Sequence, residues 1–102
     1  MRKSDEQREA ICARVEYWAQ RLHVRPRLVR VQRMTQKWGS CSTSGIVTFA
    51  TDLVKQEVGF QDFVIAHELL HLRVPNHGKL FKAVMTAHIP DWKKHDVHRR
   101  RA

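Results

Sequence analysis

Two histidines four residues apart, His67 and His71, are the residues whose types and spacing most directly indicate chemistry. They belong to the sequence His67-Glu68-Leu69-Leu70-His71, inside an apolar stretch that should be helical. Residues four apart project from one helix face, so both imidazoles can hold corners of a zinc tetrahedron. Glu68 is close enough to reach a water on such a metal. The pattern therefore indicates zinc-assisted hydrolysis, most often of a peptide bond.

The residues around this pair favour a metal site over an accidental match. The predicted helix is apolar nearly all round, which is typical of an element inside a core. Histidine and glutamate side chains there are costly unless something compensates them, and a metal does so. In the alternative interpretation, the two histidines are core residues whose hydrogen bonds alone satisfy them.

A catalytic zinc site needs a third protein ligand, and His77 is the best candidate. Pro75 cannot continue the helix, so the chain should turn at residues 74–76 and return His77 to the metal. The H-E-x-x-H-x-x-x-x-x-H spacing equals that of the metzincin zinc peptidases, which carry Gly where this chain has Val74. In the alternative, His77 only begins the next helix, with Asn76 as its N-cap.

A small sheet and several helices must position these side chains. Apolar–polar alternation predicts a strand over residues 28–34, a β-branched and aromatic run predicts another over 46–49, and residues 38–45 have the composition of a turn. The predicted helices are a first one ending before 25–27, a short one over 51–57 that Gly59 stops, the zinc helix over about 60–73, one over about 78–88, and a last one beginning near Pro90. This order predicts an α+β fold with a small antiparallel sheet packed against the active-site helix.

A chain of 102 residues is expected to form one domain, over residues 1–102. No apolar run approaches the roughly 20 residues of a membrane span, and the charged start is unlike a secretory signal. Cys12 and Cys41 form no C-x-x-C pair, so we expect reduced thiols in a cytoplasm. The oligomeric state is left open.

The net charge is +9, and the C-terminal end is the densest basic region. Its cations are Lys93, Lys94, Arg99, Arg100 and Arg101. Such a cluster attracts DNA without sequence preference and in a salt-dependent way, and no base-reading motif accompanies it. The alternative is a solvated basic tail that aids solubility. Truncation after Trp92 should remove the cluster and leave every proposed zinc ligand in place.

Four motifs resemble the YgjP-like group of metallopeptidases, which is related to the SprT-like and wider zincin proteins. They are Trp38-Gly39-Ser40-Cys41-Ser42 before a strand, residues 64–72 around the zinc motif, Asn76-His77-Gly78-Lys79-Leu80-Phe81, and Ile89-Pro90-Asp91-Trp92. The resemblance implies a minimal zincin-like domain, with zinc on His67, His71 and His77 and with Glu68 as the catalytic carboxylate. Two departures are the short segment before Trp38 and Ala50-Thr51, where an Asn is expected after the second strand.

The Trp38–Ser42 motif should lie on the substrate side of the metal, because an extended substrate usually pairs with a strand edge beside the zinc helix in zincins. Gly39 permits close backbone approach, and Ser40 offers a hydroxyl donor. Cys41 is an extra zinc ligand, a redox-sensitive thiol or, by the simplest interpretation, a small buried hydrophobe. Trp38 is expected to pack over the site. The other histidines lack the spacing of the set and are expected at the surface or at helix ends: His23, His88, His95 and His98.

The predicted function is that of a zinc-dependent metalloendopeptidase acting on peptides or proteins. A metal-activated water attacks the peptide bond, and Glu68 takes the water proton as general base and passes it to the leaving amine. Candidates for stabilising the oxyanion are Gln36, Lys37, Ser40 and a basic group near the C-terminus. Two alternatives are a basic nucleic-acid-associated module with mainly structural zinc, and a peptidase that acts on DNA-bound proteins.

Overall fold

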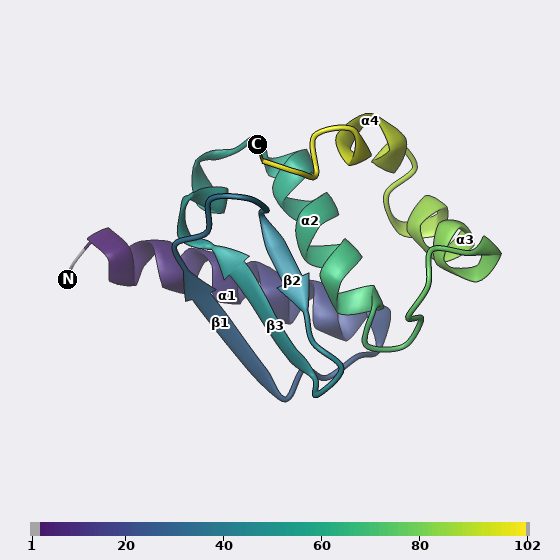
Figure 1. The fold of residues 1–102 in the computed structure, drawn as a ribbon, viewed down its shortest axis with the longest axis horizontal. Helices are drawn as coiled ribbons and strands as arrows, with labels where there is room; N and C mark the ends of the chain where they lie inside the picture. Colours follow the sequence, from purple (N-terminus) through teal and green to yellow (C-terminus); the bar gives the residue numbers. More distant parts are fainter. Residues whose placement is uncertain (1–2, 102) are drawn as a thin grey trace.

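The computed structural model describes residues 3–101, apart from the side chain of Ser4, and has an α+β fold (Figure 1). Its elements are α1 (Lys3–Leu22), β1 (Leu28–Gln32), β2 (Gly39–Cys41), β3 (Ile46–Ala50), the 3₁₀ helix η1 (Thr51–Lys55), α2 (Val58–Leu70), α3 (Lys79–His88) and α4 (Trp92–Asp96). Helix α1 runs behind the sheet, and α2 lies beside it next to β2 (Figure 1). None of the described helices is long and apolar enough to cross a membrane.

The three strands form one mixed sheet in the order β1-β3-β2. β2 is antiparallel to β3, with Gly39 opposite Phe49, whereas β1 is parallel to β3, with Leu28 opposite Ile46. The expectation of a purely antiparallel sheet is therefore wrong. The parallel pairing of β1 with β3 arises from β2, which lies inside the segment predicted as a turn. With this extra strand the chain reverses twice between β1 and β3, so β3 runs in the same direction as β1.

The second reversal is a tight turn between β2 and β3. Ser42 N–H donates to the Ile46 carbonyl at 2.9 Å, and Gly45 N–H donates to the Ser42 carbonyl at 3.1 Å. Gly45 has a φ of +89°, a conformation that glycine adopts without strain. The Ser/Gly composition thus located the turn correctly but extended it over the three residues of β2.

Helix α2 is the centre of the core. Its side chains Phe63, Ile65 and Leu69 are fully buried, as is Ile11 on α1. α1 is tied to α2 by more than apolar packing, because Arg14 and the indole N–H of Trp18 both donate to Asp62 on α2. The apolar residues that recur at helical spacing along α1 are all buried: Ile11, Val15, Trp18 and Leu22.

The junction before α2 differs from the sequence prediction. Gly59 lies in the first turn of α2 and does not end the preceding helix. A Cβ at this position would lie 3.2 Å from Nε2 of His95, so a larger residue would press on the ring of His95 in α4. His95 lies in the last turn of α4 but is buried, with its ring stacked on Phe63 at 6.0 Å between centroids, so the expectation of a surface residue is wrong. His23 is exposed just after α1, where its φ of 55° ends the helix.

Candidate metal centre

Helix α2 ends just where the proposed ligands require a turn. His71 is the C-cap residue, and the N–H of Val74 still bonds to the Leu70 carbonyl at 2.9 Å. Pro75 then directs the chain away from the helix. The side chain of Asn76 accepts a bond from Gly78 N–H at 3.1 Å, and Gly78, not Asn76, is the N-cap of α3. His77 therefore lies in a structured turn before α3.

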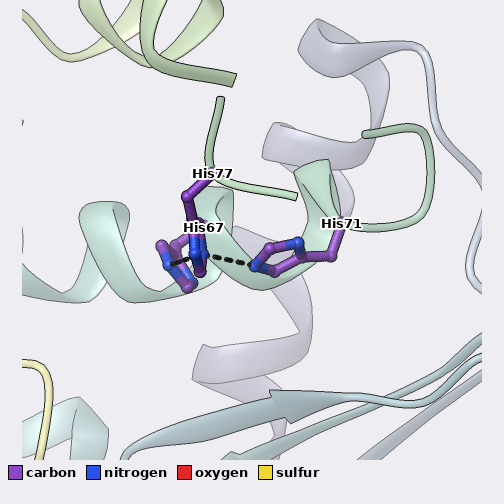
Figure 2. A group of neighbouring side chains, drawn as sticks. All are labelled: His67, His71 and His77. Carbon is purple, nitrogen blue, oxygen red and sulfur yellow. Dashed lines mark hydrogen bonds between the residues drawn. The ribbon is translucent and has the colours of Figure 1, made fainter. Parts of the chain in front are cut away.

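The three histidines converge on one point. Figure 2 shows His77 extending from the turn between α2 and α3 toward His67 in α2 and His71 at the C-cap of that helix. Its Nε2 is 3.1 Å from Nε2 of His67 and 2.9 Å from Nε2 of His71 (Figure 2). In a tetrahedral zinc site with Zn–N bonds of about 2.0–2.1 Å, neighbouring nitrogens lie about 3.3 Å apart. Within residues 3–101, this is the one group of three His, Cys, Asp or Glu side chains close enough to hold a metal ion.

The other ring nitrogens hold the imidazoles in the orientation that a metal requires. Nδ1–H of His71 donates to the Val74 carbonyl at 3.2 Å, and Nδ1–H of His67 donates to Glu68 Oε2 at 3.0 Å. Each bond leaves the Nε2 lone pair directed at the shared point. Burial, and next the nearby His67 ring, holds the pKa of His71 and of His77 below the ordinary value. The lowered pKa favours the neutral ring, which is the form that binds metal.

Glu68 lies directly beneath strand β2. A Cβ on Gly39 would be 3.0 Å from Cγ of Glu68 and 3.2 Å from a methyl of Val64, so glycine lets the strand pass this close without displacing Glu68. Glu68 is buried, and only its Oε2 has a hydrogen-bond partner in the described chain. No fully buried side-chain N or O atom there lacks a partner, so solvent must reach Oε1. One carboxylate oxygen therefore faces the cleft while the other holds His67.

Phe81 on α3 contributes to the site, although the sequence analysis named it only as the last residue of the Asn76–Phe81 motif. Its ring is almost fully buried and lies 5.3, 4.8 and 4.8 Å from the ring centroids of His67, His71 and His77. One aromatic side chain thus contacts all three imidazoles and restricts their rotation. The spacing of four residues from His77 could have indicated that Phe81 lies near the site, since residues four apart can project in the same direction.

A cleft of about 960 Å³ opens above the three histidines. Its lining comes from residues 36–43, from Val64, His67, Glu68 and His71 of α2, from Pro75 and His77, and from residues 99–101. All four residues predicted on the substrate side, Trp38, Gly39, Ser40 and Cys41, are among them. The Trp38 ring packs edge-on against Phe60, with 5.7 Å between centroids, and so forms part of the wall.

Cys41 lines this cleft but does not belong to the histidine group. It is half-buried, and its thiol donates to the Ser42 carbonyl. Burial, and next the charge of Glu68, raises the pKa of Cys41. A thiol with a raised pKa is a poor metal ligand and a poor nucleophile at pH 7. These facts favour the interpretation of Cys41 as a packing residue.

The basic C-terminal end is held to the rest of the fold through Arg101. The guanidinium of Arg101 donates to both carboxylate oxygens of Asp52, at 2.8 and 2.9 Å, and to the Met34 carbonyl at 2.9 Å. It also lies 3.7 Å from the centroid of the Trp38 ring. Truncation after Trp92 would remove this clamp and the buried His95 while leaving the three histidines in the chain, so it would change the packing of the fold together with the charge. Single charge substitutions are the cleaner test.

The chain matches the model of the YgjP-like metallopeptidase domain over residues 3–100. Its fold is similar to the crystal structure of the metallopeptidase zymogen of Methanocaldococcus jannaschii, jannalysin, with a TM-score of 0.74 over 86% of this chain and 91% of that chain. At 19% sequence identity, this similarity supports a shared fold and nothing further. No curated protein matches the sequence significantly. The four sequence motifs, the arrangement of the three histidines and the family match over nearly the whole chain agree, and the protein belongs to the YgjP-like metallopeptidase family.

Proposed function

We propose that this protein is a zinc-dependent endopeptidase whose metal ligands are His67, His71 and His77. The observation that carries the proposal is the convergence of three Nε2 atoms on the floor of a cleft, next to a carboxylate. Three imidazole ligands suit zinc, and three protein ligands suit a catalytic site, because structural zinc sites are usually completed by a fourth. A zinc ion bound there would polarise the scissile carbonyl and lower the pKa of a water toward about 7.

Glu68 is the proton carrier in this proposal. Its Oε2 is engaged with His67, which orients the ring, and its Oε1 is left for the attacking water. A carboxylate in this position can accept the water proton and deliver it to the leaving amine. Gly39 supports this role, since the absence of a side chain there lets Glu68 keep its place under β2.

The free edge of β2 is the proposed substrate-binding surface. β2 is an edge strand of the sheet. On its inner side, the Trp38 carbonyl accepts a hydrogen bond from Ala50 N–H, and Ser42 N–H donates to the Ile46 carbonyl. Peptide groups alternate in direction along an antiparallel strand, so those of Gly39 and Cys41 point away from β3 toward the cleft. An extended peptide can therefore pair with this edge and lie across the three histidines.

A second candidate keeps this chemistry and directs it to proteins bound to DNA. The observation in its favour is the net charge of +9, much of it on exposed side chains. Cleavage that requires added DNA would support it. The interpretation as a nucleic-acid module with structural zinc is weaker, because the histidines line an open cleft. We also propose a cytoplasmic location, with which two free thiols are consistent.

The test of the main proposal is Glu68→Gln. This variant should keep its zinc, because Glu68 is not a ligand, and should hydrolyse an unfolded protein about 10²–10⁴-fold more slowly, the usual contribution of a general base. Zinc content, far-ultraviolet circular dichroism and initial rates are measured on both proteins. Equal rates in the two would exclude the assigned role, and wild-type protein without activity on any peptide would count against the function itself.

A further inference from the structure

Two basic residues face each other across the end of the cleft. Lys37 and Arg100 are direct partners in an isolated antiparallel bridge. The Arg101 N–H donates to the Gln36 carbonyl at 3.1 Å. This hydrogen bond lies beside Lys37 and Arg100, which therefore form a non-hydrogen-bonded pair. In such a pair the side chains leave the backbone on the same side, with Cβ atoms about 4.5–5.5 Å apart.

Like charges directly opposite each other on paired strands repel, so this arrangement favours an anion bound between the two side chains. Both side chains are exposed and line the cleft. The other two cations of the lining are neutralised, since Arg99 pairs with Asp96 and Arg101 pairs with Asp52. In the described part of the chain, neither Lys37 nor Arg100 forms a salt bridge. The one carboxylate of the lining is Glu68, which is engaged with His67.

The pair is also held in place. Arg101, next in the chain to Arg100, is fixed by its bonds to Asp52 and Met34 and by its contact with the Trp38 ring. Trp38 is in turn adjacent to Lys37. The backbone of both cations is thus ordered before any ligand arrives, which lowers the entropic cost of binding one.

We propose that Lys37 and Arg100 form a subsite for an acidic side chain of the peptide substrate. The inference rests on the proposed peptidase function. Lys37 is two residues before Gly39, which lies against Glu68, so at about 3.3 Å per residue its Cα is about 7 Å from that of Gly39 along the wall. An acidic residue within about three positions of the cleaved bond would reach it. This peptidase therefore prefers substrates with Asp or Glu close to the scissile bond.

A peptide fits these observations better than a nucleic acid does. A nucleic-acid track needs a row of cations that follows successive phosphates, together with exposed aromatic faces for bases. Here two of the four cleft cations are neutralised, and the face of Trp38 is covered by Arg101. What remains is one pair of cations beside a free strand edge, which matches a single carboxylate on an extended chain.

The test uses short internally quenched peptides in which one Glu is moved through the three positions on either side of the cleaved bond, each matched by a Gln peptide. For wild-type protein, kcat/KM should be about tenfold higher with Glu at the best position, and the advantage should shrink as salt rises. Lys37→Glu should remove or reverse the preference. The same variant should not lose thermal stability, because it replaces a like-charge pair with an opposite-charge pair.

Lys82→Glu is the matched control, because it makes the same charge change on an exposed residue of α3 outside the cleft lining. It should keep the Glu preference. A preference that is absent in wild type, unchanged in Lys37→Glu, or equally lost in Lys82→Glu would overturn the subsite while leaving the peptidase function in place.

A second arm tests the subsite without catalysis. Anisotropy of a labelled Glu peptide and its Gln partner is measured on Glu68→Gln protein and on its double variant with Lys37→Glu. Tighter binding of the Glu peptide that disappears in the double variant supports the subsite even if no peptide is cleaved, and equal binding of the two peptides contradicts it. If a short oligonucleotide binds through Lys37 while the Glu peptide does not, the pair is a phosphate site and the inference is wrong.

Discussion

The two sides of the metal centre differ in how firmly the fold holds them. His67 and Glu68 are buried in α2, the central helix of the core, whereas His77 is exposed in a turn ahead of α3. The helix fixes its two histidines by covalent spacing and packing, so their relative position is set before metal arrives. The position of His77 depends on Pro75, on the Asn76 turn and on Phe81. Substitutions around His77 should therefore change metal affinity most, and substitutions in α2 should change fold stability most.

Metal removal should give the largest effect, and it should be uneven. A ligand present at about 1,000 times its Kd stabilises a fold by about 4 kcal/mol, which in a domain of this size raises Tm by more than 10 °C. Chelation should lower Tm accordingly. Hydrogen exchange should rise first in residues 72–88, while α2 stays protected. A uniform loss of protection, or an unchanged Tm after verified metal loss, would contradict the proposed difference between the α2 side and the His77 side.

Substitution of the third ligand is expected next. His77→Ala should weaken zinc binding by at least about 100-fold, more than most losses of an orienting partner, while Tm of the metal-free protein stays within about 2 °C of wild type because the side chain is exposed. The measurement is competition with a chromophoric chelator. Full occupancy at unchanged affinity would remove His77 from the site.

Phe81 tests whether the exposed ligand is held by packing. Phe81→Leu should lower zinc affinity about tenfold, because the contact with three imidazoles is reduced, and should shift the visible absorption of the cobalt-substituted protein. Met85→Leu is the control, since Met85 is also fully buried on α3 and has no ring contact with the histidines. Equal affinities in the two variants would show that Phe81 acts only as a core residue.

These contrasts also explain what the sequence alone could predict. The His67–His71 pair, the end of α2 and the return of His77 follow from local rules of helix spacing and proline geometry. The parallel pairing of β1 with β3 depends on a three-residue strand too short to give a pattern. The burial of His95 and the Arg101 clamp arise from contacts between segments about 30 or more residues apart, such as Asp52 with Arg101, which no local pattern encodes.

The smallest effect is expected at the clamp. The hydrogen bonds from Arg101 hold the pKa of Asp52 below its usual value, so this carboxylate stabilises the fold above about pH 4. That contribution disappears as pH falls through the lowered pKa. Because Asp52 is partly exposed, Asp52→Asn should cost only about 0.5–1 kcal/mol at pH 7. Urea unfolding of both proteins at pH 7 and pH 3 checks this, and a difference that grows at low pH would be the wrong sign.

The central claim is that His67, His71 and His77 hold a catalytic zinc ion, and anomalous diffraction at the zinc edge tests it most directly. We expect one anomalous peak per chain, about 2.0–2.1 Å from Nε2 of each of the three histidines, with a fourth coordination position that no protein atom fills. A peak elsewhere, or a fourth protein ligand such as Cys41 closing the site, would contradict it.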